Sequence, residues 1–193
     1  MDFNKLSPRQ QAVYIAKQRL AQKPIYIDTE TTGLDRQAEI VEIAIIDHDG
    51  SILFDELIKP IRPIPSGAAA VHHITNEMVA TAKSWAVHWP TIRSILFGRV
   101  IGFYNEEFDM RMIRQTHTNV GFPWKENFQT FCVMKLYAQF AGQIDPRRRT
   151  YKYHKLEAAG RACGIPLPNT HRAADDTLLT RALLEYMANY TGK

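Results

Sequence analysis

The chain has 193 residues, of which 45% are hydrophobic and 10% aromatic, and its formal net charge at pH 7 is +4. This composition excludes a disordered protein and fits one packed domain, while the mildly basic charge permits a polyanionic partner without requiring one. Because it has two cysteines, no signal-like start and no apolar run of roughly 20 residues, we expect a cytoplasmic protein without a membrane span.

A helix and three strands are the first elements predicted along the chain. Residues 7–22 have Ser7 as a plausible N-cap, Pro8 at the first helical position and apolar residues at helical spacing, which predicts an amphipathic helix. Residues 24–30 form a short apolar, β-rich run. Residues 39–60 contain two longer runs joined by the turn signal DHDGS. We therefore expect three neighbouring strands, the last two antiparallel.

Helices dominate the rest of the chain. A Pro-rich loop leads into Ala-rich and polar helical pieces, and the apolar run VIGFY over 100–104 predicts a fourth, buried strand. Further helices are predicted at residues 89–98, 105–117, 128–142, 154–165 and 171–190. One strand between helices, after an early group of strands, indicates a single α/β domain with a mixed sheet flanked by helices.

Acidic residues occur at the ends of several of these elements. Asp28 and Glu30 are two residues apart on a predicted strand, so their side chains point to the same face, about 6.6 Å apart. Asp176 shares the apolar face of the last helix with Leu179, which predicts a semi-buried acid. Asp109 has a comparable position on the helix after the fourth strand. Each of these acids is expected at an element that borders the centre of the sheet.

Four gathered carboxylates require compensation by positive charge. Two carboxylates about 4 Å apart repel by about 4 kcal/mol at an effective dielectric constant of 20. Oxygen ligands suit Mg²⁺ or Mn²⁺, and two such ions nearly neutralise four acids and can stabilise an in-line displacement. His171, five residues before Asp176, is expected in a loop just before the last helix. A histidine there is a candidate base for a water molecule near neutral pH.

Three motifs in this order resemble those of a known enzyme class. DTETTG (28–33), NEEFD (105–109) and HRAADD (171–176) resemble the exonuclease motifs of the DEDDh class of 3′–5′ exonucleases. This DnaQ-like class contains the proofreading epsilon subunit of bacterial DNA polymerase III, ribonuclease T and oligoribonuclease. The resemblance covers about residues 24–190 and implies a ribonuclease H-like fold. It divides the chain into an N-terminal helical extension (1–23) and an exonuclease domain (24–193).

The resemblance also implies roles for individual residues. Asp28, Glu30, Asp109 and Asp176 match the four ligands of two Mg²⁺ or Mn²⁺ ions, and His171 matches the general base. Thr31, Thr32 and Gly33 match the turn that meets the terminal nucleotide, Leu34 matches the apolar residue near its base, and Asn105 and Phe108 match supporting positions. The segment VHHIT (71–75) resembles a VHGIT-like loop, which makes His72 a candidate substrate contact and places His73 where Gly is usual.

The function expected from these motifs is removal of nucleoside 5′-monophosphates from single-stranded or frayed 3′ ends, DNA being favoured over RNA. The alternatives are an RNA-trimming exoribonuclease and a non-catalytic nucleic-acid-binding or polymerase-associated module; the intact acids count against the module. A polymerase partner and a homodimer both remain open. The short segment after the last helix favours a free-standing nuclease over a dedicated polymerase III subunit, and the exonuclease resemblance implies a role in DNA repair or proofreading.

A basic stretch with interleaved aromatic residues, DPRRRTYKYHK, covers residues 145–155. It contains three consecutive arginines, Arg147, Arg148 and Arg149, followed by Tyr151 and Tyr153. Such a stretch is either a solvated basic loop or a segment that steers the phosphate backbone and stacks on the bases of a single strand.

Overall fold

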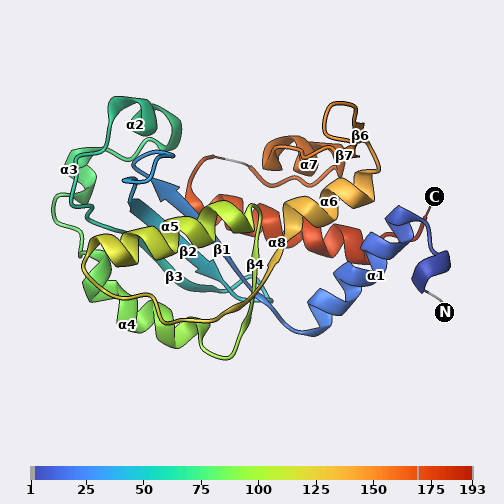
Figure 1. Cartoon of the computed structure of the whole chain (residues 1–193), viewed down its shortest axis with the longest axis horizontal. Helices are drawn as coiled ribbons and strands as arrows, with labels where there is room; N and C mark the ends of the chain where they lie inside the picture. Colours follow the sequence, from blue (N-terminus) through green and yellow to red (C-terminus); the bar gives the residue numbers. More distant parts are fainter. Residues whose placement is uncertain (1–2, 169, 193) are drawn as a thin grey trace.

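A five-stranded mixed sheet forms the centre of the molecule, which a computed structural model describes over residues 3–168 and 170–192 (Figure 1). The strands are β1 (Ile25–Thr31), β2 (Ile40–Ile46), β3 (Ile52–Leu57), β4 (Val100–Phe103) and β5 (Gln129–Cys132). Their order is β3-β2-β1-β4-β5; β2 is antiparallel to β1 and β3, whereas β4 is parallel to β1 and β5. The predicted α/β class with a mixed sheet is confirmed.

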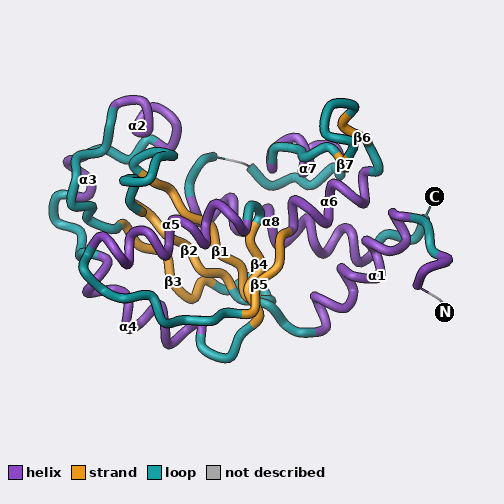
Figure 2. The backbone as a smooth tube through the Cα atoms, in the orientation of Figure 1, coloured by secondary structure: helices purple, strands orange, loops and turns teal. Residues whose placement is uncertain are grey.

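Helices flank this sheet on both faces (Figure 1). They follow a short 3₁₀ turn (Phe3–Lys5) and are α1 (Pro8–Ala21), α2 (Ser66–His72), α3 (Asn76–Val79), α4 (Trp85–Leu96), α5 (Glu106–Asn119), α6 (Val133–Ala141), α7 (Leu156–Ala162) and α8 (Ala173–Asn189). Two short strands, β6 (Ile144–Asp145) and β7 (Thr150–Tyr151), form a separate hairpin inside the basic stretch (Figure 2).

The alternation of side chains along β1 decides which helix each residue meets. Ile25 and Ile27 belong to the apolar cluster that includes α4 and α5, whereas Tyr26 belongs to the cluster formed with α1, α6 and α8. Successive residues of a strand point to opposite faces. Asp28 and Glu30 continue the series begun by Tyr26, so their side chains point toward the α8 side of the sheet.

The N-terminal helix α1 is capped and packed as its sequence predicts. The Ser7 hydroxyl accepts a hydrogen bond from the Gln10 amide, and the Gln10 side chain accepts one from the Ser7 amide at 2.9 Å. Pro8 occupies the first turn, where its missing N–H costs no helical hydrogen bond. Ala12 and Ala16 are fully buried in the cluster shared with α6 and α8. Helix α1 is therefore part of the packed core.

One predicted helix was wrong over its first residues. The segment 128–142 reads as a continuous helix, but Gln129–Cys132 forms strand β5, and the helix begins at Val133. Strand β5 pairs in parallel with the free edge of β4 and buries Phe131 and Cys132. Pairing with a distant strand thus outweighs the local helical pattern, as is common for short β-prone segments.

We expect Gly102→Ala to destabilise the sheet, because a methyl group there has no room. A Cβ at Gly102 would lie 2.7 Å from Cζ of Phe131 and 3.0 Å from Cδ1 of Tyr26. Overpacking of this kind costs about 1–3 kcal/mol, which urea denaturation measures. Gly67→Ala in α2 is the control, since no atom lies within 4 Å of its Cβ position. Equal effects of the two substitutions would contradict the prediction.

Candidate active site

Strand β1 delivers two carboxylates to the end of the sheet beside α8. In the antiparallel ladder with β2, Asp28 lies opposite Ala44 and Glu30 lies opposite Glu42. The register shifts directly after Glu30, where β1 leaves the regular ladder. Asp28 and Glu30 are both half-buried. The alternation thus places both carboxylates on one face of the strand, as expected from their spacing.

Helix α8 brings a third carboxylate to the same place. Asp176 is only 6% exposed and lies one turn before Leu179, which is 1% exposed. Carboxylate oxygens of Asp28, Glu30 and Asp176 all lie within 4.8 Å of one another. The predicted burial of Asp176 is confirmed, and residues from the first strand and the last helix form one acidic cluster.

The fourth predicted acid, Asp109, approaches from the α5 side. It is 3% exposed, and its Oδ1 accepts a 2.8 Å hydrogen bond from the Thr29 hydroxyl. Thr29 alternates with Asp28 and Glu30 along β1, so it points to the opposite face. Asp109 is outside the group of acids within 4.8 Å, yet it is close enough for its charge to raise the pKa of Asp28.

The crowded acids resist ionisation. Burial, followed by the charges of Asp109 and Glu30, holds the pKa of Asp28 well above its ordinary value. Burial and then the charge of Asp176 raise the pKa of Glu30 to about 8. Buried carboxyl groups that lie close together keep their protons unless a cation offsets the negative charge of the ionised form. All the donors are oxygens, a set that fits hard divalent ions such as Mg²⁺ or Mn²⁺.

A buried glutamate on β2 holds the start of α8. Glu42 is 2% exposed, and its carboxylate accepts hydrogen bonds from Nε of Arg172 at 3.0 and 3.1 Å and from the Ala173 amide at 2.9 Å. Nη2 of Arg172 forms an ion pair with the same carboxylate. This pair was not among the predicted site residues. The sequence feature that could have revealed the pair is an acid in the middle of an apolar strand. That strand is fully buried, and an unpaired charge there is costly.

His171 lies directly before this clamped helix start. Its backbone has φ 54°, in the left-handed region that residues other than glycine seldom adopt, and the residue is exposed. The predicted placement in a loop before α8 is confirmed. His171, Asp28 and Asp176 line one hollow of about 520 Å³, so the imidazole and the acidic cluster face a common space.

The rest of this hollow, which we call the active-site hollow, comes from the starts of α5, α6 and α7 and from the end of the basic stretch. Its other lining residues are Tyr104, Asn105, Met134, Tyr153, His154, Lys155, Leu156 and Glu157. Tyr104 donates a 2.6 Å hydrogen bond to the carbonyl of His154, which fixes the segment after β7 over the end of β4. His154 and Lys155 were not individually predicted as site residues; they ended the basic stretch 145–155.

At the end of β1 and in the turn after it, two threonines are buried and one leucine is exposed. The Thr31 hydroxyl donates to the Gly33 carbonyl at 2.8 Å, and the Thr32 hydroxyl accepts from the Glu39 amide at 2.9 Å. Both threonines are buried, whereas Leu34 is 77% exposed. Of these four predicted contact residues, Leu34 is therefore the one whose side chain stands free for a base.

The remaining predicted contact residues differ in how exposed their side chains are. His72, the last residue of α2, is 2% exposed, and its Nδ1 accepts a 3.0 Å hydrogen bond from the Ile74 amide. His73 ends that helix at φ 60° and thus adopts the conformation that the usual glycine would supply. Asn105 precedes α5 and lines the active-site hollow, and Phe108 is half-buried on α5.

Comparison with known proteins assigns the family. A family model described as Exonuclease matches residues 25–184. The chain belongs to the exonuclease family. As a member of this family it is a hydrolytic nuclease that acts on nucleic acid, and its sheet and flanking helices are the ribonuclease H-like fold. Helix α1 lies outside the matched residues.

Individual exonucleases resemble the chain over most of its length. It is 40% identical to an uncharacterized exonuclease of Escherichia phage 186 over 90% of this chain and 92% of the relative. It is 34% identical to exodeoxyribonuclease 10 of Escherichia coli K12 over 86% of this chain and 69% of that protein. Exonuclease X in complex with 5′ overhanging duplex DNA superposes with a TM-score of 0.64 and 31% identity, over 88% of this chain and 93% of that one.

No helix among residues 3–168 and 170–192 is long and apolar enough to cross a membrane.

Proposed function

We propose that this exonuclease removes nucleoside 5′-monophosphates from single-stranded or frayed 3′ ends of DNA with the help of two divalent cations. The observation that supports this most directly is the convergence of Asp28, Glu30 and Asp176 within 4.8 Å, beside a hollow that His171 also lines. The DNA substrates named for exodeoxyribonuclease 10 and for the exonuclease X complex support DNA as the substrate.

The acidic cluster provides the ligands. Asp28, Glu30 and Asp176 would hold Mg²⁺ or Mn²⁺, with Asp109 completing the set from the α5 side. Bound divalent ions would supply the positive charge that stabilises the attacking and leaving oxygens of phosphodiester cleavage. The protein's own contribution is to fix the acids: the Thr29 hydroxyl orients Asp109, and the ladder with β2 orients Asp28 and Glu30.

His171 is the proposed general base. It is exposed and lines the same hollow as Asp28 and Asp176, so it is the proposed base for a water molecule bound in that hollow. Proton removal makes that water a better nucleophile toward phosphorus. The protonated imidazole can then return its proton to solvent, since the residue is exposed.

The turn after β1 is the proposed seat of the terminal nucleotide. Leu34 is 77% exposed and follows Glu30 by four residues, which makes it the proposed apolar contact for the last base. The internal hydrogen bonds of Thr31 and Thr32 fix the backbone of this turn. An end-binding turn beside the metal ligands supports stepwise removal of single nucleotides.

One assay tests direction, substrate and metal together. Strands labelled at the 5′ end, as single-stranded DNA, single-stranded RNA, a two-nucleotide RNA and mismatched duplex DNA, are incubated with and without Mg²⁺. We expect a ladder of shortened labelled products from DNA that depends on Mg²⁺. Immediate release of a labelled mononucleotide would indicate the opposite direction. A ladder from RNA alone would instead support an exoribonuclease, and no cleavage would support a binding module.

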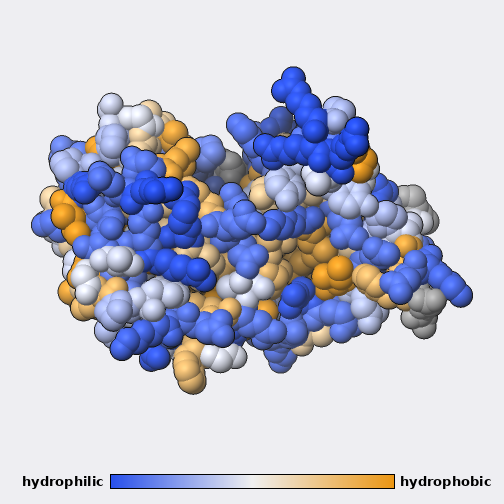
Figure 3. All heavy atoms as spheres, viewed as in Figure 1, coloured by the Kyte–Doolittle hydropathy of each residue, from blue (hydrophilic) through white to orange (hydrophobic). Residues whose placement is uncertain are grey.

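We expect the β6–β7 hairpin to guide the cleaved strand electrostatically. Arg147, Arg148 and Arg149 are exposed on the hairpin, whose hydrophilic surface projects from the molecule (Figure 3). The chain then continues through Tyr153 to Lys155, which line the active-site hollow. Replacing the three arginines by glutamine should therefore raise KM for single-stranded DNA and flatten its salt dependence.

The matched control for this prediction replaces three other exposed cations, Lys17, Lys23 and Lys83, by glutamine and thus makes the same change in net charge. KM is measured at several salt concentrations for both variants. If the hairpin variant keeps the wild-type KM at every salt concentration, the hairpin is a solvated loop without a role in binding.

A further inference from the structure

Helix α1 borders a hollow that is separate from the candidate active site. This α1 groove has a volume of about 790 Å³ and lies between α1 and the chain that follows α8. None of the described residues that line it also lines the active-site hollow. In Figure 1, α1 and the end of α8 lie together at one end of the molecule, whereas β1 runs toward the other end. A ligand in the α1 groove therefore leaves the acidic cluster accessible.

The walls of the α1 groove are held together by Arg9. Its Nε donates a 2.9 Å hydrogen bond to the carbonyl of Phe140 on α6, and its Nη1 donates a 3.4 Å hydrogen bond to the hydroxyl of Tyr190. The guanidinium also lies 5.3 Å from the ring centre of Phe140 and 5.6 Å from that of Tyr190. Together with the buried Ala12 and Ala16, these contacts fix α1 against α6 and α8. A preformed groove loses little conformational freedom when it binds a ligand.

Apolar side chains of α1 and of the turn before it reach the surface along this groove. Tyr14 is 46% exposed, and the half-buried Leu6 and Val13 line the groove with it. The exposed ring of Phe3 packs edge-on against Tyr14, with the ring centres 5.6 Å apart. Exposed apolar side chains that gather in one place mark an interaction surface, whereas singly scattered ones do not. The outer face of α1 therefore offers an apolar contact for a partner.

The charge around the α1 groove is positive. Residues 3–23 contain five basic residues and no aspartate or glutamate. Arg9 and Lys17 line the groove itself, and no acid is among its described lining residues. Lys17 is exposed and forms no ion pair with another described residue. The groove is therefore complementary in charge to a partner that carries carboxylates.

These features distinguish between the possible occupants of the groove. A second copy of the chain in a symmetric dimer would bring the same cations face to face, where they repel. A nucleic-acid backbone derives its affinity from many phosphate contacts, whereas the described lining of the groove has two cations, of which Arg9 already donates to Phe140 and Tyr190. An acidic protein segment with an apolar side chain matches both the charge and the exposed apolar surface.

We propose that the α1 groove binds an acidic segment of a partner protein. An apolar or aromatic side chain of that segment packs against Tyr14, and its carboxylates lie beside Lys17. Helix α1 lies outside residues 25–184, which the exonuclease family model matches, so this docking site is an addition to the catalytic domain. The partner holds the nuclease in an assembly while the acidic cluster stays open to nucleic acid. The inference does not depend on the direction or the substrate of cleavage.

An array of short synthetic peptides tests this proposal with the whole 193-residue chain. The first set of peptides places one leucine, phenylalanine or tryptophan at each position among aspartates and glutamates. A second set replaces the acids by lysine, and a third replaces the apolar residue by serine. The strongest binder is labelled with fluorescein and titrated by fluorescence anisotropy. We expect binding by the first set alone, with a Kd that rises with salt because salt screens the charges.

Two substitutions locate the binding site on α1. Tyr14→Ser removes the aromatic contact and Lys17→Glu reverses the charge, and each should raise the Kd of the acidic peptide at least about tenfold. The matched controls, Phe97→Ser and Lys83→Glu, change an exposed aromatic residue and an exposed lysine outside the groove and should leave the Kd within about twofold of the wild type. All four variants should keep the nuclease activity of the wild type, because none of these residues lines the active-site hollow.

Several results would overturn the proposal. Acidic peptides that bind no better than the lysine or serine sets would show that the groove does not recognise such a segment. An unchanged Kd in both Tyr14→Ser and Lys17→Glu would place the binding elsewhere. Displacement of the peptide by a single-stranded oligonucleotide would make the groove a nucleic-acid site. A wild-type dimer in sedimentation that Tyr14→Ser dissociates would make it an interface between copies of the chain.

Discussion

Asp28→Asn protein will lose nearly all hydrolysis and, without divalent cations, will be more stable than the wild type. The loss should exceed about a thousandfold, equivalent to about 4 kcal/mol of transition-state stabilisation. At alkaline pH, where the crowded acids ionise, the substitution removes one negative charge from the cluster and therefore stabilises the fold. Two carboxylates about 4 Å apart repel by about 4 kcal/mol at an effective dielectric constant of 20, so a gain of about 1–3 kcal/mol is expected.

The same crowding predicts how stability depends on pH. The folded-state pKa of Glu30, about 8, is above the ordinary value of 4.5, so the folded protein holds this proton more tightly than the unfolded chain. The contribution of Glu30 is therefore complete below about pH 4.5 and is lost as the pH rises toward 8. In EDTA the free energy of unfolding should fall over this interval. Mg²⁺ should reduce the fall by binding the ionised acids, and Asp28→Asn should also reduce it.

Asp175→Asn is the matched control for Asp28→Asn. Asp175 precedes Asp176 on α8 but binds the Thr170 hydroxyl instead of joining the cluster. This variant should keep its activity and its pH profile in urea denaturation. Full activity of Asp28→Asn, or a metal-free stability below that of the wild type, would contradict the role given to the cluster.

Glu42→Gln will cut the rate by about ten- to a hundredfold while the sheet stays folded. The substitution removes the charge that binds Arg172 and weakens the acceptor for the Ala173 amide. Charge-assisted hydrogen bonds contribute about 1.5–3 kcal/mol each, so the start of α8 should loosen. His171 directly precedes Arg172, and Asp176 lies within the first turn of α8. Both residues should therefore become less well positioned when the contacts of Glu42 are weakened. The expected effect is on kcat more than on KM.

Hydrogen exchange separates positioning by Glu42 from a general loss of stability. The Ala173 amide should exchange faster in Glu42→Gln, whereas amides in β4 keep their protection. Glu56→Gln is the control, because Glu56 is an exposed glutamate on the neighbouring strand β3. Equal exchange at Ala173 in the wild type and in Glu42→Gln would show that the carboxylate does not hold the helix start.

The sequence predicted those parts of the site that depend on local periodicity. The two-residue spacing placed Asp28 and Glu30 on one face of β1, and helical spacing placed Asp176 on the buried face of α8. Features that depend on contacts between segments far apart in the chain were not predicted. Strand β5 was missed because the sequence of residues 129–132 does not reveal that the edge of β4 is available for pairing. The bond between Glu42 and Arg172 was missed because it joins elements far apart in the chain.

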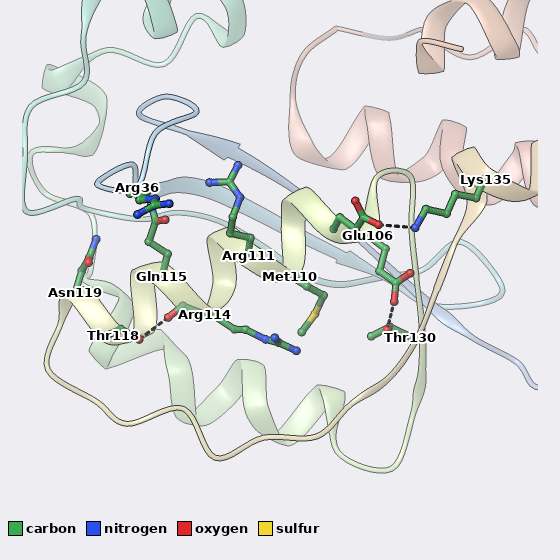
Figure 4. Close-up of a pocket in the computed structure, with 11 residues that line it drawn as sticks. Arg36, Glu106, Met110, Arg111, Arg114, Gln115, Thr118, Asn119, Thr130 and Lys135 are labelled. Atoms are coloured by element: carbon green, nitrogen blue, oxygen red, sulfur yellow. Dashed lines mark hydrogen bonds and ion pairs between the residues drawn. The ribbon is translucent and has the colours of Figure 1, made fainter. Parts of the chain in front are cut away.

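The hollow along the exposed face of α5, which Arg36, Arg111 and Arg114 line (Figure 4), also lies beyond such patterns. Arg111 and Arg114 are ordinary exposed residues on a helix. They form part of a hollow only because the loop after β1 brings Arg36 to the same place. Residue spacing on α5 shows which side chains share a face but not which loop crosses that face. The loop is held by Gln115, whose side chain donates to the carbonyls of Asp35 and Ala38.

The acidic cluster takes its members from β1, the first strand, and α8, the last helix of the described chain. On the ribosome, β1 emerges long before α8, so an unfinished chain has Asp28 and Glu30 but lacks their partner. The acidic cluster is assembled only when α8 docks on the sheet. A nascent chain therefore cannot assemble this acidic cluster before α8 has left the ribosome.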